Sequence, residues 1–365
     1  MKKRTIVIAS VLKPIDDTRM FEKFSISLSD SDNYNVVIIG YPSRAKPDYP
    51  NVSFIALQPF GRLSLQRLYA PLIVLLKLYK VKHDVLIVNT HELLIVALLN
   101  RILFGGKIIY DVQENYYRNI LFTNAFPKLL RPALALWVRT KEKLAAPFIH
   151  WFLLAEKGYE KEFTFTKKRI TILENKPRVP VPLSREKTSS KTKLLFSGTL
   201  GESTGVFQAI DLAKSLHHLN PSITLHIIGF ASRQDSYLRI KDEILGCNFI
   251  TLTGGNYLVP HGEIMKAILA ADFGIIIYPP SPHTQNTMPT KLYEYVACRL
   301  PILLQNHRPW VEYCHPFEAA IVLENDSDLT DLLSRMKTQA FYTKDFDSVS
   351  WSTEEEKLLN LLAEI

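Results

Sequence analysis

Residues 193–216, KLLFSGTLGESTGVFQAIDLAKSL, decide the fold class of this chain. An apolar run ends at Ser197 and Gly198, two more glycines follow at Gly201 and Gly205, and apolar residues then recur at helical spacing. A buried strand, a glycine turn and a helix in this order form the βα unit of a parallel sheet. The free N–H groups at such a helix start also suit a phosphate, although a bare βα turn of this kind is purely structural about as often.

Similar apolar runs recur along the chain, with helical stretches between them. They lie at residues 5–10, 35–40, 84–89, 107–111 and 149–154 and, in a second series, at 193–197, 224–229, 248–252, 272–278, 301–305 and 320–323. Apolar runs without polar alternation, joined by long connections, indicate parallel strands buried on both faces. The sequence therefore predicts an α/β protein with two Rossmann-like, doubly wound domains.

A stretch rich in Pro, Ser and Lys separates the two series and marks the domain boundary. We predict an N-terminal domain over residues 1–178, a linker over 179–192 and a C-terminal domain over 193–345. Residues 346–365 carry acids before leucines at helical spacing, which predicts a last helix crossing back to the N-terminal domain. Ligands of doubly wound sheets lie beyond the carboxyl ends of the strands, so we expect the site in a cleft that both domains face.

Composition excludes several classes of protein. The chain has 365 residues, of which 47% are hydrophobic and 22% charged, so it has the material for packed cores rather than for disorder. The cysteines Cys247, Cys298 and Cys314 lie in no metal-ligand spacing and favour a reducing compartment. No apolar window reaches the roughly 18 residues that a spanning helix needs. We expect a cytoplasmic protein that is not integral to a membrane.

Charge is divided unevenly along the chain. Residues 1–180 hold 28 Lys or Arg and 15 Asp or Glu, a net charge of +13, and the remainder of the chain is acidic. Residues 49–83 and 115–141 contain no acid and mix basic residues with apolar ones such as Leu68, Leu72 and Trp137.

This mixture of basic and apolar residues suits an anionic lipid surface, where each Lys or Arg contributes about 1 kcal/mol to binding. A solvated basic helix face is the alternative, and nucleic acid also attracts such charge, but we find no recognition motif for it. We therefore predict peripheral binding to the inner face of the plasma membrane and no nucleic-acid partner.

A second informative stretch, NTMPTKLYEY, covers residues 286–295. Pro289 suits the first turn of a helix, which would place Lys291 and Glu294 on one face of that turn. A lysine there can neutralise a diphosphate, and a glutamate can accept hydrogen bonds from ribose hydroxyls. The alternative is a surface ion pair, which would contribute less than about 1 kcal/mol to stability.

These two stretches, with DDTR at 16–19 and YDVQE at 110–114, resemble the retaining GT-B glycosyltransferases of the group-1 type (family four). The resemblance implies a nucleotide-diphosphate sugar donor, UDP- or GDP-linked, held mainly by the C-terminal domain. It implies a glycan or lipid-linked acceptor on the N-terminal domain, as in cell-surface polysaccharide or glycoconjugate synthesis. The enzyme would be a hexosyltransferase that retains configuration, with no metal and no cofactor, because the nucleotide sugar is a substrate.

The resemblance and the positions of the motifs give three groups of candidate site residues. The catalytic group is Lys291, Glu294, Asn286 and Gln113. The donor-binding group is Ser197, Gly198, Thr199, Gly229, Thr287, Met288, Pro289, Thr290 and Leu292. The acceptor-side group is Asp17, Arg19, Asp111 and His91. A local Asp17–Arg19 salt bridge and an ordinary helix start at His91 are the structural alternatives within the last group.

The chain departs from the family pattern at three places. Asn286 stands where the family has the first of two glutamates, and Gln113 stands where it often has a histidine. Thr199 and Thr204 replace a basic pair that clamps the diphosphate in many members. Two alternatives therefore remain open: a catalytically weak or inactive GT-B scaffold that binds nucleotide sugars, and a nucleotide-sugar 2-epimerase.

Overall fold

The computed structural model describes residues 3–43, 47–58, 60, 64–123, 126–166, 169–179, 191–282, 284, 287–324, 328–344 and 349–365. The chain divides into two compact units, unit 1 (Met1–Arg178 with Trp351–Ile365) and unit 2 (Val179–Ser350). Most of the predicted linker lies outside the described residues, and the first strand of unit 2 begins at its last residue, Thr192.

Unit 1 is built on a parallel sheet that, in the described part of the chain, has seven strands in the order β3-β2-β1-β4-β5-β6-β7. The strands are β1 (Arg4–Pro14), β2 (Tyr34–Tyr41), β3 (Val52–Ala56), β4 (Val85–Val88), β5 (Lys107–Val112), β6 (Trp151–Leu154) and β7 (Ile170–Ile172). This order, with the first strand in the middle, is that of a doubly wound fold. The sequence predicted five of these strands, and β3 and β7 are additions at the two edges.

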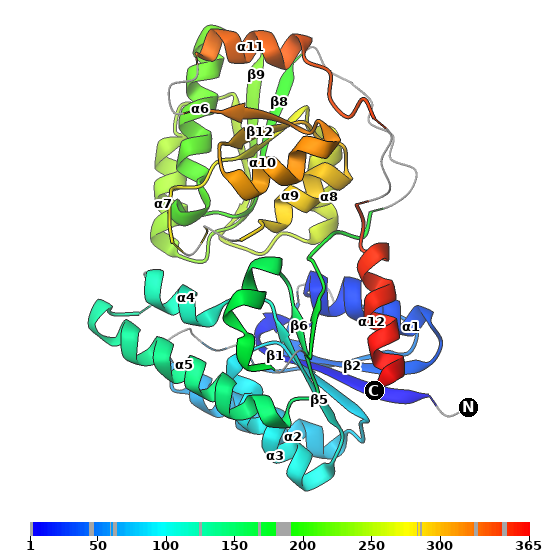
Figure 1. The fold of residues 1–365 in the computed structure, drawn as a ribbon. Helices are drawn as coiled ribbons and strands as arrows, with labels where there is room; N and C mark the ends of the chain where they lie inside the picture. The colour runs from blue at the N-terminus through cyan, green and yellow to red at the C-terminus, as the bar shows by residue number, and fades with distance from the viewer. Residues whose placement is uncertain are drawn as a thin grey trace. The chain divides into compact units, whose positions relative to one another are not determined.

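Helices cover both faces of this sheet (Figure 1). One face packs against α2 (Gln66–Lys80), α3 (Leu94–Phe104) and α5 (Arg131–Ala145), and the short α4 (Tyr116–Phe122) packs on α5. The other face packs against a π-helix (Thr18–Ser25), α1 (Ile26–Asp30) and α12 (Ser352–Glu364). Short 3-10 helices lie at His91–Leu93, Lys128–Leu130, Ala146–Phe148, Lys157–Glu162 and Thr164–Thr166.

Unit 2 has a parallel sheet of six described strands in the order β10-β9-β8-β11-β12-β13. They are β8 (Thr192–Thr199), β9 (Ile223–Phe230), β10 (Ile250–Gly255), β11 (Phe273–Ile276), β12 (Ile302–Gln305) and β13 (Ala320–Leu323). The helices are α6 (Val206–Leu219), α7 (Gln234–Glu243), α8 (His261–Ala270), α9 (Thr290–Ala297), α10 (Arg308–Cys314) and α11 (Leu329–Thr338), with 3-10 turns at Glu202–Thr204 and His315–Phe317. Two cores, one on each face of the sheet, show that this unit is also doubly wound.

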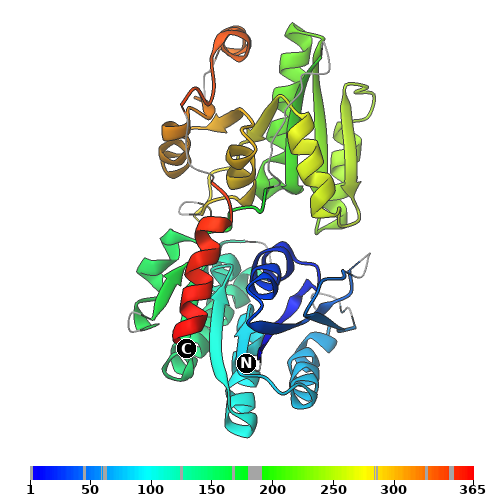
Figure 2. The ribbon, with the colours of Figure 1, turned by 90° about the vertical axis from the view of Figure 1, so that its right-hand side faces the viewer.

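The predicted return of the chain to the first unit is confirmed by α12. Figure 2 shows this helix, in red, beside the strands of unit 1. Trp351 is fully buried against Phe24, and its indole N–H donates a 2.8 Å hydrogen bond to the Ser27 hydroxyl. The buried Glu354 accepts from Lys176 at 2.6 Å and Lys357 at 2.8 Å. The helix is therefore part of the unit 1 core. No helix in the described ranges is long and apolar enough to cross a bilayer.

We expect Trp351→Ala to lower the free energy of unfolding of unit 1 by about 3–5 kcal/mol, because it empties a large core site and removes the indole hydrogen bond to the Ser27 hydroxyl. Urea unfolding measures this loss. Trp137→Ala is the matched control, since Trp137 is 55% exposed and should change stability little. Equal losses in the two variants would contradict the packing of α12.

Candidate functional site

The carboxyl ends of β8, β9 and β10 carry a row of glycines. Gly198, Gly229 and Gly254 pair side by side in the sheet and have φ values of 98°, 153° and 88°. A Cβ atom on Gly229 would clash with the carbonyl oxygen of Gly198, so this close approach of two strands requires glycine. Predicted donor residues Gly198 and Gly229 thus form a bare backbone edge at the end of the sheet where doubly wound folds bind ligands.

Lys291 lies beside this edge. It is the second residue of α9 and is 6% exposed, and a Cβ on Gly198 would lie 3.9 Å from its Cε. Its Nζ lies 3.7 Å from the centre of the Phe196 ring and has no hydrogen-bond partner among the described residues. Burial lowers the pKa of Lys291 to about 7, against the charge of Glu294, which raises it. The result is a buried amine to which no carboxylate of the described residues is hydrogen-bonded.

Glu294 lies one turn further along α9 and is 8% exposed. The His261 Nε2 lies 3.2 Å from the Glu294 Oε1, and it acts as the donor because a carboxylate can only accept. Lys291 and Glu294 are therefore both buried, which rules out the solvated surface ion pair considered as the alternative. His261 was not predicted as a site residue: it lies 33 positions from Glu294, so only the fold brings the two together.

Other predicted donor residues have structural contacts. The Ser197 hydroxyl lies 2.9 Å from the Tyr295 hydroxyl, which ties the end of β8 to α9. The Thr204 hydroxyl donates to the Thr199 carbonyl at 2.7 Å and so closes the turn before α6. The two threonines that replace the family's basic pair are thus hydrogen-bonded to each other, through the Thr204 hydroxyl and the Thr199 carbonyl.

The segment before α9 is partly described. Asn286 lies outside the described residues. Pro289, expected in the first turn of a helix, lies directly before the helix, which begins at Thr290. Thr287 hydrogen-bonds Thr284, and the Trp310 indole donates to the Thr287 carbonyl at 2.7 Å. Met288 packs on the core, and Leu292 is fully buried, so these two shape the segment rather than offer polar groups.

In unit 1, two predicted acceptor residues form a buried ion pair. Arg19 is 1% exposed and Asp111 0%. The Arg19 Nε and Nη2 donate to the Asp111 carboxylate at 2.7–3.1 Å, and Nη1 donates to the Leu173 carbonyl at 2.9 Å. The local salt bridge with Asp17 is therefore not what forms, because Asp17 accepts from the backbone N–H groups of Arg19 and Met20 and caps the π-helix. Each charge of the Arg19–Asp111 pair is therefore matched inside the protein, and removal of either partner would leave the other charge buried and uncompensated.

Gln113 and Asn89 complete the set of donors around Asp111. The Gln113 amide donates to Oδ2 at 3.0 Å and the Asn89 amide at 2.8 Å. Both lie just past the carboxyl ends of their strands, β5 and β4. Gln113 is half-buried, so the bond to Asp111 orients it at this edge of the sheet.

His91 is held in a polar cluster under α5. The ring is 8% exposed, and its Nδ1 accepts a 3.0 Å hydrogen bond from the Lys141 ammonium. Burial, helped by the charges of Lys141 and Arg67, lowers the pKa of His91 to about 4, so the ring is neutral at pH 7. It begins a 3-10 helix ahead of α3, which agrees with the structural alternative of a helix start.

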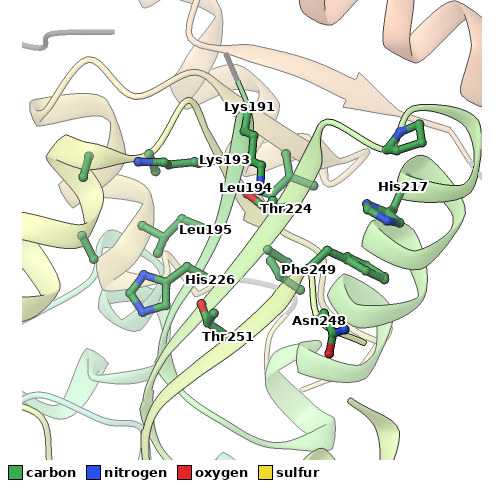
Figure 3. Close-up of a pocket in the computed structure, with 15 residues that line it drawn as sticks. Lys191, Lys193, Leu194, Leu195, His217, Thr224, His226, Asn248, Phe249 and Thr251 are labelled. Carbon is green, nitrogen blue, oxygen red and sulfur yellow. The ribbon is translucent and has the colours of Figure 1, made fainter. Parts of the chain in front are cut away.

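Two further features concern the molecule outside the predicted site. No group of three metal-ligating side chains occurs among the residues that the structure describes. A hollow of about 590 Å³ lies at the amino ends of β8, β9 and β10, lined by Lys193, Thr224, His226 and Thr251 (Figure 3). It contains none of the predicted residues and lies at the end of the strands away from the glycine row.

Residues 183–340 match the sequence profile of the family described as glycosyl transferases group 1. This part of the chain is a group 1 glycosyltransferase domain. The resemblance inferred from the sequence is thereby confirmed. No curated protein shows significant sequence similarity to this chain.

Solved structures with the same fold cover nearly the whole chain. Sucrose-phosphate synthase from Thermosynechococcus elongatus has 13% identity and a TM-score of 0.69, with 99% of each chain covered. Anabaena HepE in complex with UDP and glucose has 14% identity and a TM-score of 0.64, again with 99% of each covered. The catalytic domain of starch synthase IV from Arabidopsis thaliana, bound to ADP and acarbose, has 12% identity and a TM-score of 0.65, covering 100% of this chain and 99% of that one. These matches confirm the GT-B fold with two Rossmann-like domains.

We expect Lys291→Met to raise the melting temperature of the ligand-free protein by roughly 3 °C, because a buried charge without a partner is replaced by an apolar side chain of similar length. The lysine binds fewer protons in the folded state than in the unfolded state between pH 7 and its ordinary pKa of 10.5. The stability of the wild type therefore rises with pH across that window, and the gain in the variant should be largest at or below about pH 7 and shrink above it. Thermal unfolding at about pH 6 and about pH 9 measures both effects. A variant that is less stable than the wild type at both values would show that the ammonium has a partner.

Proposed function

We propose that this chain transfers a hexosyl group from a UDP- or GDP-linked sugar to a glycan or lipid-linked acceptor. The observation that carries the proposal is the Lys291 Nζ, which lies beside the bare backbone at Gly198 and has no hydrogen-bond partner in the part of the chain that the structure describes. A buried ammonium is costly unless an anion accompanies it, and a diphosphate supplies one. When the sugar leaves, charge develops on the departing nucleotide diphosphate, and a cation already in place stabilises it without reorganisation.

Glu294 fits the role of ribose anchor. One carboxylate oxygen accepts from His261, so the other is left for hydrogen bonds from ribose hydroxyls. In this proposal the histidine is a positioning residue, because it orients the glutamate and does not touch the donor. Asn286 and Gln113 would position the donor sugar, as the family resemblance implies.

The class of donor is supported by the complexes of similar structures. HepE is seen with UDP and with UDP-glucose, and starch synthase IV with ADP. Retention of configuration, independence of metal and a role in cell-surface polysaccharide or glycoconjugate synthesis are parts of the proposal that follow from the resemblance alone. The two alternatives, an inactive nucleotide-sugar scaffold and a 2-epimerase, are not favoured, because the family profile and the similar structures named above are those of glycosyltransferases and synthases.

We also propose that the enzyme works in the cytoplasm at the inner face of the plasma membrane. The net charge of +13 in residues 1–180 supports attraction to anionic lipid, where a lipid-linked acceptor would be met.

Lys291→Ala should lower turnover of the nucleotide-sugar donor by roughly 30- to 1000-fold, the equivalent of about 2–4 kcal/mol of lost transition-state stabilisation. The donor is first identified by the thermal shift that UDP- and GDP-sugars produce, and turnover is then measured as release of nucleotide diphosphate. Lys266→Ala, an exposed lysine on α8 in the same unit, is the matched control and should keep full activity. Undiminished turnover in Lys291→Ala would refute the assignment.

His261→Ala should raise the KM for the donor several-fold, by roughly 1 kcal/mol of lost hydrogen-bond energy, and leave kcat nearly unchanged. His261→Gln keeps an N–H donor and should restore most of the affinity. A fall in kcat with an unchanged KM in His261→Ala would instead place the histidine in the chemical step.

A further inference from the structure

The exposed apolar side chains of this protein are concentrated on one part of unit 1. Of 24 large apolar side chains that are exposed among the described residues, 19 lie between residues 65 and 148. Those on α2 are Leu68, Tyr69, Leu72, Ile73, Leu76 and Tyr79; those on α3 are Ile95, Leu99, Ile102, Leu103 and Phe104; those on α5 are Leu136, Trp137 and Leu144. Soluble proteins rarely expose so much apolar surface in one place without a partner for it.

The pattern within α2 shows that this exposure is not accidental. The helix buries only a narrow stripe, Ala70, Val74 and Leu78, against the sheet. Its larger apolar side chains point away from the core, with Leu68 74% and Leu76 60% exposed. An ordinary surface helix places polar residues on that side. The outward side of α2 therefore carries large apolar side chains in addition to the stripe that packs on the sheet.

The three helices form a single face. α3 lies between α2 and α5 and contacts both, and all three pack on the same side of the sheet (Figure 1). The rings of Tyr79 and Phe104, at the ends of α2 and α3, lie 5.5 Å apart. Because the helices share one layer, their outward sides face the same way. We call the exposed apolar residues of α2, α3 and α5 the apolar helix face.

The charges around this face have one sign. Lys77 and Lys80 on α2 and Lys143 on α5 are exposed, and Arg101 lies on α3 between them. The three helices contain a single acid, Glu142, which is 1% exposed and accepts a hydrogen bond from the buried Tyr110 hydroxyl. A second copy of this chain docked on the same face would set basic residues against basic residues, which is unfavourable. An anionic lipid surface matches both the charge and the apolar side chains.

We propose that the apolar helix face binds an anionic lipid bilayer and brings lipid-linked acceptors to unit 1. This rests on the membrane location proposed above and names the surface responsible. Leucines, tyrosines and Trp137 enter the boundary between head groups and acyl chains, and the lysines remain at the head groups.

The position of the face within unit 1 suits that role. Arg67, at the start of α2, forms an ion pair with Glu92 at 2.5 Å, just past the carboxyl end of β4. The amino end of α2 therefore lies at the edge of the sheet where doubly wound folds bind ligands. An acceptor with a lipid tail could keep that tail in the bilayer along α2 while its head group reaches this edge.

Flotation of the full chain with vesicles tests the proposal. We expect binding to vesicles of phosphatidylglycerol and phosphatidylcholine, and little binding to phosphatidylcholine alone. Raising the salt from about 0.1 M to about 1 M shortens the screening length from about 10 Å to about 3 Å. Binding should therefore weaken, but the part of the binding that comes from apolar insertion should remain. Vesicles with brominated acyl chains should quench tryptophan fluorescence, and Trp137→Phe should abolish the quenching.

Substitutions separate this face from other surfaces. Leu68→Gln, Leu72→Gln and Leu76→Gln combined should reduce partitioning into anionic vesicles by roughly tenfold or more. The matched control is Leu238→Gln with Leu245→Gln, two exposed leucines of unit 2 that should leave binding unchanged. Thermal unfolding and the donor-induced thermal shift should be the same in all variants, so a loss of vesicle binding is not a loss of folding or of the proposed transferase site.

Three outcomes would overturn the proposal. One is no binding of the wild type to anionic vesicles at low salt, and another is unchanged binding of the triple variant. The third is a concentration-dependent dimer, or a complex with nucleic acid, that the triple variant abolishes. Failure of the proposed function is a different result, namely no thermal shift with any nucleotide sugar while vesicle binding persists.

Discussion

A parallel sheet must be covered on both faces, and this constraint determines where polar chemistry and exposed apolar surface occur in the protein. The strands of both units are apolar on both sides and need helices over each face. Polar groups of the backbone and of side chains are then left at the carboxyl edges of the sheets. The backbone of Gly198 and Gly229 in unit 2, and the side chains of Asn89 and Gln113 in unit 1, lie at those edges. In unit 1, α2 meets the same constraint with a narrow buried stripe, and much of its outward side remains apolar.

Two buried basic side chains, Arg19 and Lys291, differ in whether the described residues supply an acceptor for their charge. Arg19 has a carboxylate and a carbonyl within hydrogen-bond distance, so its charge is matched inside the protein. Lys291 has two aromatic rings near its ammonium and no hydrogen-bond acceptor among the described residues, and its pKa falls to about 7. Sequence reasoning gave both residues a role in ligand binding. Arg19 is paired within the protein, whereas the Lys291 Nζ has no hydrogen-bond acceptor among the described residues.

Most of the fold could be predicted because it follows from local pattern. All eleven predicted apolar runs are strands. Acids followed by leucines also predicted the last helix, α12, which brings the chain back to unit 1. The two strands that escaped prediction, β3 and β7, are the edges of the first sheet and have no fully buried residue. An edge strand lacks neighbours on one side, so it does not need the continuous apolar run by which the others were recognised.

The sequence alone determined the two doubly wound domains, the family resemblance and the placement of Lys291 and Glu294 on one helix, because strand periodicity, glycine turns and helical spacing are local properties. Tertiary structure decided the partners: Arg19 pairs with Asp111, 92 positions away, and His261 with Glu294. It also decided that Leu68, Leu72 and Trp137 are exposed rather than core. Composition could not separate those two outcomes, since an apolar residue on a helix is buried or exposed according to which side of the helix the sheet covers.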